Sequence, residues 1–313
     1  MKILVTGGAG YIGSAAVKSL IEKGQEVVVV DNLSKGKKKL VDKNAIFYET
    51  DLIDKEKLEE IFKKHQIDAI IHFAAYKAVG ESMSNASKYS HNITGTINLL
   101  DCMVKFNVKK LIFSSSAAVY GMPDVKVIDE NITLNPINYY GFTKLECERI
   151  IEWYNKVHNI QYINLRYFNV VGDAGLKYID PEAENIFPII MEVITGKREK
   201  LVIFGNDYNT EDGTCVRDYI DVNDLVDAHI LALTVNYNGS INLGTGNGFS
   251  VKQLVEAFME VTGKKFKYEY GDRRPGDPAA LIASNEKAAK ILKWKPRRSL
   301  REMIKTTYEA YQE

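Results

Sequence analysis

The sequence contains few cysteines, and their spacing matches neither a disulfide framework nor a metal site. Its three cysteines, Cys102, Cys147 and Cys215, lie far apart and form no CxxC motif. This pattern indicates structural thiols in a reducing compartment. The five histidines form neither an HExxH motif nor a Cys/His set, so the sequence predicts no metal site.

The chain also lacks a long apolar run and an excess of charge of either sign. No run of about 18 apolar residues is present, and Gly7 follows the first apolar segment too closely to leave room for a secretory signal. We therefore expect a cytoplasmic protein without a membrane partner. The 41 Lys and Arg residues balance the 41 Asp and Glu residues, so no global field attracts nucleic acid. An anionic ligand has to be held by local groups.

Short Val- and Ile-rich segments alternate with amphipathic segments through the first half of the chain. Strands that are apolar throughout are typical of a parallel sheet covered on both faces, so the alternation predicts an α/β fold with a Rossmann-type doubly wound parallel sheet. The expected strands are residues 3–5, 26–30, 46–48, 69–72, 111–113 and 162–165, and the expected helices include 12–22 and 58–64.

This alternation breaks after about Asn169. We expect a dinucleotide-binding domain over residues 1–168 and a smaller α/β substrate domain mainly over 169–313, with an approximate boundary and segments that interleave. Because no repeat, low-complexity tract or linker separates the halves, we expect them to pack closely around a ligand cleft.

A glycine-rich turn follows the first expected strand and opens the first expected helix. Gly7, Gly10 and Gly13 form a GxxGxxG pattern, in which small residues let the backbone approach a pyrophosphate at a helix N-terminus. The next strand ends in Asp31, whose carboxylate would accept ribose hydroxyls and repel a 2′-phosphate, which favours NAD over NADP. The alternative is a tight turn followed by an unrelated aspartate.

Three further positions follow expected strands or lie near this turn. Asp51 could bond the adenine amino group, and the segment Phe73–Ala75 offers small residues beside a cofactor, although strand ends also carry small residues for packing. Asn92 could face the cofactor or cap a helix.

Tyr140 and Lys144 lie four residues apart in an expected helix, so their side chains share one face. A tyrosine phenol titrates near about 10, and an adjacent cation would favour the phenolate that a general base needs. Such pairs are also common on surface helices, so the pair alone does not establish catalysis.

Several longer segments resemble the extended short-chain dehydrogenase/reductases, and within them the UDP-galactose 4-epimerase family. The segments are residues 72–82, 113–121, 166–169 and 203–219, and the resemblance covers nearly the full length. It implies a UDP-glucose/UDP-galactose 4-epimerase that inverts C4 through a transient 4-keto sugar. It also implies tightly bound NAD, regenerated each turnover, and a homodimer formed through segments 89–106 and 140–157.

The resemblance assigns roles to individual residues. Tyr140 would be the base, Lys144 would hold the nicotinamide ribose, and Ser116 would contact the sugar oxygen. The implied cofactor-binding residues are Gly7, Gly10, Tyr11, Ile12, Gly13, Asp31, Asn32, Asp51, Leu52, Phe73, Ala74, Ala75, Lys77, Asn92, Tyr140, Lys144 and Tyr167. The implied substrate-binding residues are Lys77, Ser116, Tyr140, Asn169, Asn185, Phe204, Arg217, Arg274, Asp277 and Leu281.

The sequence departs from the family pattern in three places. The loop from Gly172 to Glu184, which precedes Asn185, is short, and Val170 replaces a frequent proline. Leu281 occupies the position that limits the size of the sugar 2-substituent, so UDP-N-acetylhexosamines, or another UDP-sugar, remain alternative substrates.

Two other functions compete with epimerisation. A nucleotide-sugar 4,6-dehydratase would need a carboxylate in the segment that here reads Ser116-Ala117-Ala118. A catalytically inactive NAD sensor would retain the fold, but such proteins usually lose the catalytic Tyr or Lys.

Overall fold

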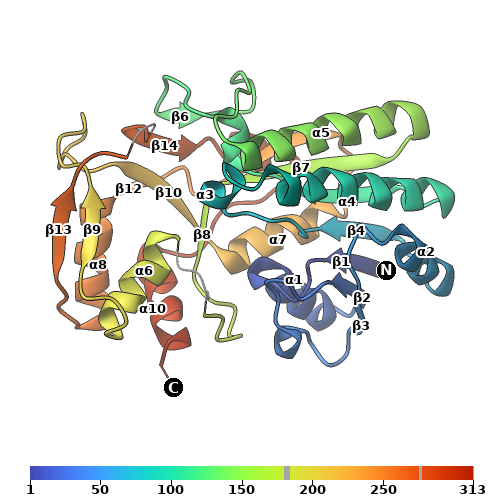
Figure 1. Cartoon of the computed structure of the whole chain (residues 1–313), viewed down its shortest axis with the longest axis horizontal. Helices are drawn as coiled ribbons and strands as arrows, with labels where there is room; N and C mark the ends of the chain where they lie inside the picture. The colour runs from blue at the N-terminus through green and yellow to red at the C-terminus, as the bar shows by residue number, and fades with distance from the viewer. Residues whose placement is uncertain (180–183, 275–276, 313) are drawn as a thin grey trace. The chain divides into compact units, whose positions relative to one another are not determined.

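The computed structural model describes residues 1–179, 184–274 and 277–312, and the chain divides into two compact units (Figure 1). The first unit contains residues 1–121, 133–166 and 226–241, and the second contains residues 122–132, 167–225 and 242–313. The chain therefore passes between the units several times. Residues 122–132, from the first half of the sequence, belong to the second unit, and residues 226–241, from the second half, belong to the first unit.

A seven-stranded sheet forms the centre of the first unit, with the strand order β11-β7-β5-β4-β1-β2-β3. The contacts of β1 with β2 and β4, of β2 with β3, and of β5 with β4 and β7 are parallel. Because β1 lies between β4 and β2, the sheet grows in both directions from it, which confirms the predicted doubly wound α/β fold. The strands are β1 (Lys2–Thr6), β2 (Glu26–Asp31), β3 (Ile46–Glu49), β4 (Ala69–His72), β5 (Lys110–Ser114), β7 (Gln161–Tyr167) and β11 (Gly239–Leu243).

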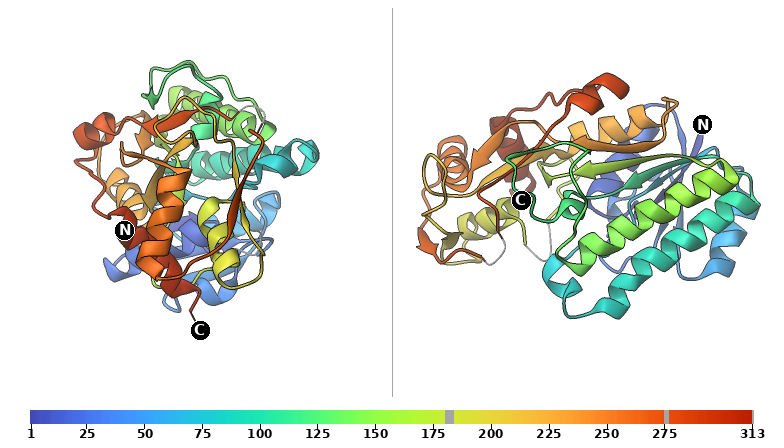
Figure 2. Two further views of the ribbon diagram at one scale, coloured as in Figure 1. Left: turned by 90° about the vertical axis from the view of Figure 1, so that its left-hand side faces the viewer. Right: turned by 90° about the horizontal axis from the view of Figure 1, so that it is seen from above.

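Helices cover both faces of this sheet (Figure 1). Helices α2, α4 and α5 pack on one face, where α4 and α5 lie side by side (Figure 2). Helices α1 and α7 lie on the other, and an ion pair of 3.6 Å joins Lys23, just after α1, to Asp227 of α7. The helices are α1 (Tyr11–Glu22), α2 (Lys55–Lys64), α3 (Val79–Ser82), α4 (Ala86–Lys105), α5 (Tyr139–His158) and α7 (Val222–Ala232), with the short 3-10 helices η1 (Lys38–Leu40) and η2 (Ala117–Tyr120).

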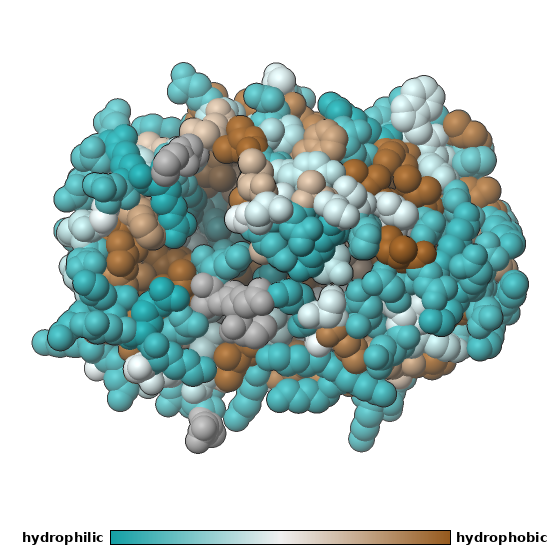
Figure 3. Space-filling model, viewed as in Figure 1, coloured by the Kyte–Doolittle hydropathy of each residue, from teal (hydrophilic) through white to brown (hydrophobic). Residues whose placement is uncertain are grey.

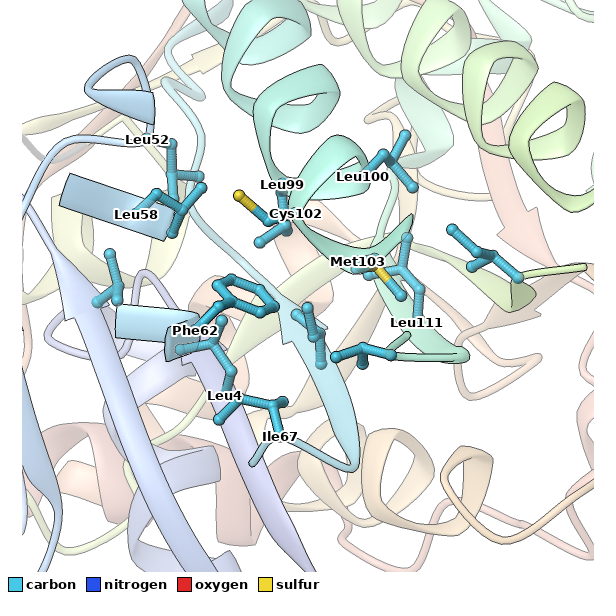
Figure 4. Close-up of a cluster of buried hydrophobic side chains, with 14 of the residues drawn as sticks. Leu4, Leu52, Leu58, Phe62, Ile67, Leu99, Leu100, Cys102, Met103 and Leu111 are labelled. Atoms are coloured by element: carbon cyan, nitrogen blue, oxygen red, sulfur yellow. The ribbon is translucent and has the colours of Figure 1, made fainter. Parts of the chain in front are cut away.

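Alternate strand residues supply the core beneath α2, α4 and α5. Leu4 of β1 and Leu111 of β5 pack against Phe62 of α2 and Leu99 of α4, and all four are buried (Figure 4). Each such side chain contributes about 1.5–3 kcal/mol on burial. The neighbouring strand residues, such as Val5 and Ile112, point to the opposite face and are also buried, which explains why these strands read as apolar throughout.

The second unit contains a mixed sheet and a two-stranded parallel sheet. Its main sheet has the order β12-β10-β14-β6, with β8 also paired to β10, and β13 pairs with β9. Helices α6, α8 and α10 supply its core. The elements are β6 (Val127–Ile128), β8 (Asn169–Val171), α6 (Ile186–Ile194), β9 (Leu201–Phe204), β10 (Val216–Asp221), β12 (Gly248–Ser250), α8 (Val251–Thr262), β13 (Tyr268–Gly271), β14 (Ala280–Ala283), α9 (Glu286–Ile291) and α10 (Leu300–Ala310).

Hydrophilic residues predominate on the face shown in Figure 3, and apolar residues form scattered patches between them. Within the described part of the chain, none of the helices combines the length and apolar character needed to cross a membrane. The three cysteines are buried free thiols.

Candidate active site

The glycine turn lies where β1 ends and closes against the segment that follows β4. Gly7 has a φ of +73°, and a Cβ atom there would lie 2.6 Å from the Ala74 backbone nitrogen. A Cβ atom on Gly13 would lie 2.0 Å from the Gly7 carbonyl oxygen. Both positions therefore require glycine, and Phe73 to Ala75 lie half-buried beside the turn.

Helix α1 begins directly after this turn without a side-chain cap. Gly10 is its N-cap residue and has no side chain that could bond the first-turn N–H groups. Tyr11 and Ile12 form the first turn and are half-buried. An uncapped helix N-terminus presents backbone N–H groups and a partial positive charge. The turn therefore fits a bound pyrophosphate.

Asp31 lies at the end of β2, directly beside the glycine turn. Its two carboxylate oxygens accept hydrogen bonds from the backbone N–H groups of Ala9 (3.0 Å) and Leu33 (2.8 Å). Burial raises the pKa of this carboxyl, although the two N–H groups act in the opposite direction. These bonds fix the orientation of the carboxylate and leave each oxygen a second lone pair for a ribose hydroxyl.

Asn32 and Asp51 connect the ends of β2 and β3. The Asn32 amide donates to the Asp51 carboxylate at 2.7 Å, and this polar pair borders the same edge of the sheet. Leu52 is buried against Gly95 of α4. Leu52 therefore contributes to packing, and the cofactor contact implied by the resemblance stays a prediction.

Asn92 clamps the loop between β4 and α3. Its amide oxygen accepts from the Tyr76 N–H at 2.9 Å, while its nitrogen donates to the Tyr76 carbonyl at 3.0 Å and to the Thr143 hydroxyl at 3.2 Å. The helix-cap alternative is wrong, because Asn92 lies inside α4 and Asn85 caps that helix. Lys77, the next residue of the clamped loop, is exposed.

Ser116 and Tyr140 meet at the carboxyl end of β5. The pKa of Tyr140 is raised by burial, and a hydrogen bond that the Ser116 hydroxyl donates to the phenol oxygen acts in the opposite direction. Ser116 also caps η2 by accepting from the Ala118 N–H at 3.1 Å. Asn138 caps α5 by accepting from the Gly141 N–H at 2.8 Å, which places Tyr140 in the first turn of the helix with a half-buried side chain.

Lys144 lies one turn further along α5 and is buried. Its ammonium donates to the Ser114 carbonyl at 2.6 Å and lies 4.9 Å from the centroid of the Phe113 ring. Burial lowers the pKa of Lys144 to about 8. The sequence predicted that the ammonium shares a helix face with the Tyr140 phenol, and in the structure the ammonium donates to the backbone that leads to Ser116.

A buried ion pair that the sequence interpretation missed lies behind these residues. Glu148 of α5 accepts from Arg166 of β7 through both guanidinium Nε, at 2.9 Å, and Nη2, at 2.5 Å. The Ser115 hydroxyl donates to the same carboxylate. The available signal was the continued spacing of four residues from Tyr140 to Lys144 to Glu148.

A polar and aromatic group forms in the second unit. The guanidinium of Arg217, on β10, is paired with the Asp277 carboxylate. The Asp277 N–H donates to the Arg274 carbonyl at 3.2 Å, and the Arg274 guanidinium lies 4.0 Å from the centroid of the Phe204 ring. Leu281 of β14 lies directly beside Arg217 in the sheet register. The structure therefore links five of the predicted substrate-binding residues.

Three other predicted site residues, Asn169, Asn185 and Tyr167, also belong to the second unit. Asn169 pairs with Tyr219 of β10 in the sheet register, and its amide donates to the Asp218 carbonyl at 2.9 Å. Asn185 is exposed at the N-cap of α6, and its side chain does not cap that helix. Tyr167 ends β7 and is half-buried.

Comparisons with known proteins agree with this arrangement. The model of the NAD dependent epimerase/dehydratase family matches residues 3–244. A UDP-glucose 4-epimerase of Streptococcus mutans serotype c is 49% identical over 306 residues, which cover 95% of this chain and 92% of the relative. These matches confirm the resemblance inferred from the sequence motifs.

Two solved structures are similar over almost the whole chain. One UDP-glucose 4-epimerase has a TM-score of 0.96 at 45% identity and covers 99% of this chain and 97% of its own. The Stenotrophomonas maltophila UDP-glucose-4-epimerase, solved with bound NAD and formylated UDP-arabinopyranose, has a TM-score of 0.96 at 37% identity and covers 99% and 98%.

Proposed function

Because the chain belongs to the NAD-dependent epimerase/dehydratase family, we propose that it interconverts UDP-glucose and UDP-galactose by inverting C4 of the sugar. The observation that carries this proposal is the hydrogen-bonded pair of Ser116 and Tyr140, with Lys144 one helical turn away. This is an acid/base group at the end of a strand beside a dinucleotide turn.

Tyr140 takes the proton from the sugar 4-hydroxyl. In the second half of the reaction it returns the proton to the C4 oxygen, which then has the opposite configuration. Ser116 bridges between the phenol and the sugar oxygen and keeps the phenol oriented. Lys144 keeps two of its three N–H donors for the cofactor ribose, since the Ser114 carbonyl takes one. Bound NAD would supply the hydride acceptor for oxidation at C4 and the hydride donor for the return step.

Arg217 and Arg274 bind the nucleotide part of the substrate. A guanidinium matches a diphosphate bidentately, and Asp277 holds that of Arg217 in place. Phe204 is 36% exposed, which leaves part of its ring available to uracil, while Asn169 and Asn185 supply amide groups. Leu281, beside Arg217, leaves room for the 2-hydroxyl of a plain hexose.

The test is incubation of the purified protein with a panel of UDP-sugars, followed by proton NMR. We expect UDP-galactose and UDP-glucose to reach the same equilibrium mixture from either side. Conversion of only UDP-N-acetylhexosamines would move the substrate assignment to those sugars, and a 4-keto-6-deoxy product would assign a dehydratase. Bound NAD with every sugar unchanged would favour the sensor.

We further propose that the enzyme is a cytoplasmic homodimer paired through α4 and α5. Trp153 and Val157, one turn apart on α5, are each 63% exposed and lie on one face of the helix, where a partner helix could cover both. The buried free thiols suit a reducing compartment. Light scattering should give a dimer mass, twice the chain mass of 35.3 kDa. The W153E variant should give the mass of a monomer.

A further inference from the structure

Three residues of α5 contact three consecutive residues at the carboxyl end of β5. Tyr140 bonds the Ser116 hydroxyl, Lys144 donates to the Ser114 carbonyl, and Glu148 accepts from the Ser115 hydroxyl. Because residues four apart lie on one face of a helix, successive turns of α5 grip the segment 114–116. The proposed acid/base chemistry uses the first two contacts and leaves the third without a role.

The third contact belongs to a buried charged network. Glu148 and Arg166 have side-chain exposures of 6% and 5%, and Ser115 is fully buried. Arg166 also donates to the Tyr120 hydroxyl at 3.0 Å. Tyr120 ends η2, the short helix that Ser116 caps. The network therefore contacts the chain on both sides of Ser116, at Ser115 and at Tyr120.

A buried ion pair is a costly way to stabilise a fold, since apolar residues of similar volume often serve equally well. Here the carboxylate holds Ser115, the residue directly before Ser116. The Ser115 N–H also donates to the Leu165 carbonyl at 2.9 Å, so the backbone and the side chain of Ser115 are both fixed.

We propose that Glu148, held by Arg166, is a positioning residue for epimerisation: through Ser115 it sets Ser116 against the Tyr140 phenol, and its charge supports the Lys144 ammonium. This inference rests on the proposed function. The titratable groups that face Lys144 are Glu148 and Cys147 on α5, Tyr140 on the preceding turn, and His72 at the end of β4. Glu148 is the carboxylate of this set.

The first experiment compares S115A with S240A. Ser240 donates to the same Glu148 carboxylate at 3.4 Å but does not belong to the segment 114–116, so it is a matched control. We expect S115A to lower kcat about tenfold, the loss of roughly one hydrogen bond to a charged group, with an unchanged KM for the UDP-sugar. S240A should keep both constants.

A purely structural role would give a different result. It predicts that S115A and S240A both lower the melting temperature and leave kcat intact, and this outcome overturns the proposal. If S115A does not fold, S115C replaces it, because the thiol fills the space with a weaker donor.

The second experiment compares the pH dependence of kcat in E148Q and E152Q. Glu152 lies one turn further along α5 and pairs with Lys156 at the surface. Removing the Glu148 charge disfavours the ammonium, so the alkaline fall in activity should begin roughly half to one pH unit lower in E148Q. E152Q should match the parent. If unpaired Arg166 unfolds E148Q, the charge-free double variant E148Q/R166M is measured instead.

A third measurement needs no activity and separates this inference from the proposed function. The tyrosinate ultraviolet band of each protein is titrated against that of its own Y140F variant, which isolates Tyr140. S115A should titrate at higher pH than the parent, because the Ser116 bond that favours the phenolate is weakened. A parent inert toward every UDP-sugar refutes the proposed function, whereas identical titrations refute the positioning role.

Discussion

His72 should make the folded protein sensitive to mild acid. Its ring is buried at the end of β4, where Nδ1 lies 2.6 Å from the Thr6 hydroxyl and Nε2 lies 3.1 Å from the Thr96 hydroxyl. Burial, assisted by the Lys144 charge, lowers the pKa of His72 to about 3. The folded state therefore keeps the imidazole neutral, whereas the unfolded chain protonates it near about 6.5.

The sign of the effect follows from this difference. Since only the unfolded chain binds the proton between pH 6.5 and 3, the free energy of unfolding falls with decreasing pH across that window, by about 1.4 kcal/mol per pH unit. With a folded-state pKa of about 3, His72 lowers the free energy of unfolding by about 2 kcal/mol at pH 5, and this reduction approaches about 5 kcal/mol near pH 3.

Urea unfolding of the parent and of H72Q at pH 7, 6 and 5 measures this contribution. H72Q should be less stable at pH 7, by about 1–3 kcal/mol for the disturbed buried hydrogen bonds. The gap should then narrow by about 2 kcal/mol at pH 5, because glutamine does not titrate. H91Q, at an exposed histidine of α4, is the control and should follow the parent. A gap between H72Q and the parent that stays constant from pH 7 to pH 5 would refute the reasoning.

Three further substitutions test the site. G13A places a Cβ atom 2.0 Å from the Gly7 carbonyl, so we expect loss of bound NAD and a destabilisation of roughly 3 kcal/mol or more; an NAD-loaded variant with the parent's melting temperature would contradict this. Y140F should lower kcat by about 10²-fold or more while calorimetry still detects UDP binding, and substantial remaining turnover would exclude Tyr140 as the base. R217K keeps the charge but loses the bidentate geometry, so its affinity for UDP should fall about tenfold, and equal affinities would remove Arg217 from the nucleotide site.

Local patterns were sufficient to predict six strands of the first unit, but not β11, which comes from the second half of the chain. Strands such as Ala69–His72 are short apolar runs whose composition follows from burial on both faces, and α1 begins directly after the glycine turn. Local patterns did not predict which chain segments belong to which unit. Residues 122–132 belong to the second unit because β6 pairs with β14, about 150 positions away in sequence, and no local pattern encodes that pairing.

The same distinction applies to the site. The shared face of Tyr140 and Lys144 follows from helical periodicity alone, and the structure bears it out in α5. The roles of Asn92 and Glu148 depend on partners from other elements, the loop at Tyr76 in one case and Ser115 and Arg166 in the other. A polar residue inside a helix has many possible partners, so its role becomes visible only when the fold is known.

Burial shifts the pKa values of Tyr140 and Lys144 in opposite directions. It raises the pKa of the phenol and lowers the pKa of the ammonium to about 8, because a desolvated site disfavours each charged form. Since the ordinary pKa values of the two groups are nearly equal, burial moves them apart and favours the neutral phenol and the neutral amine. The Ser116 hydrogen bond favours the phenolate, and the Glu148 carboxylate favours the ammonium. The contacts between the segment 114–116 and three turns of α5 thus include both groups that oppose the effect of burial, and they favour the phenolate and the ammonium that acid/base exchange with the sugar uses.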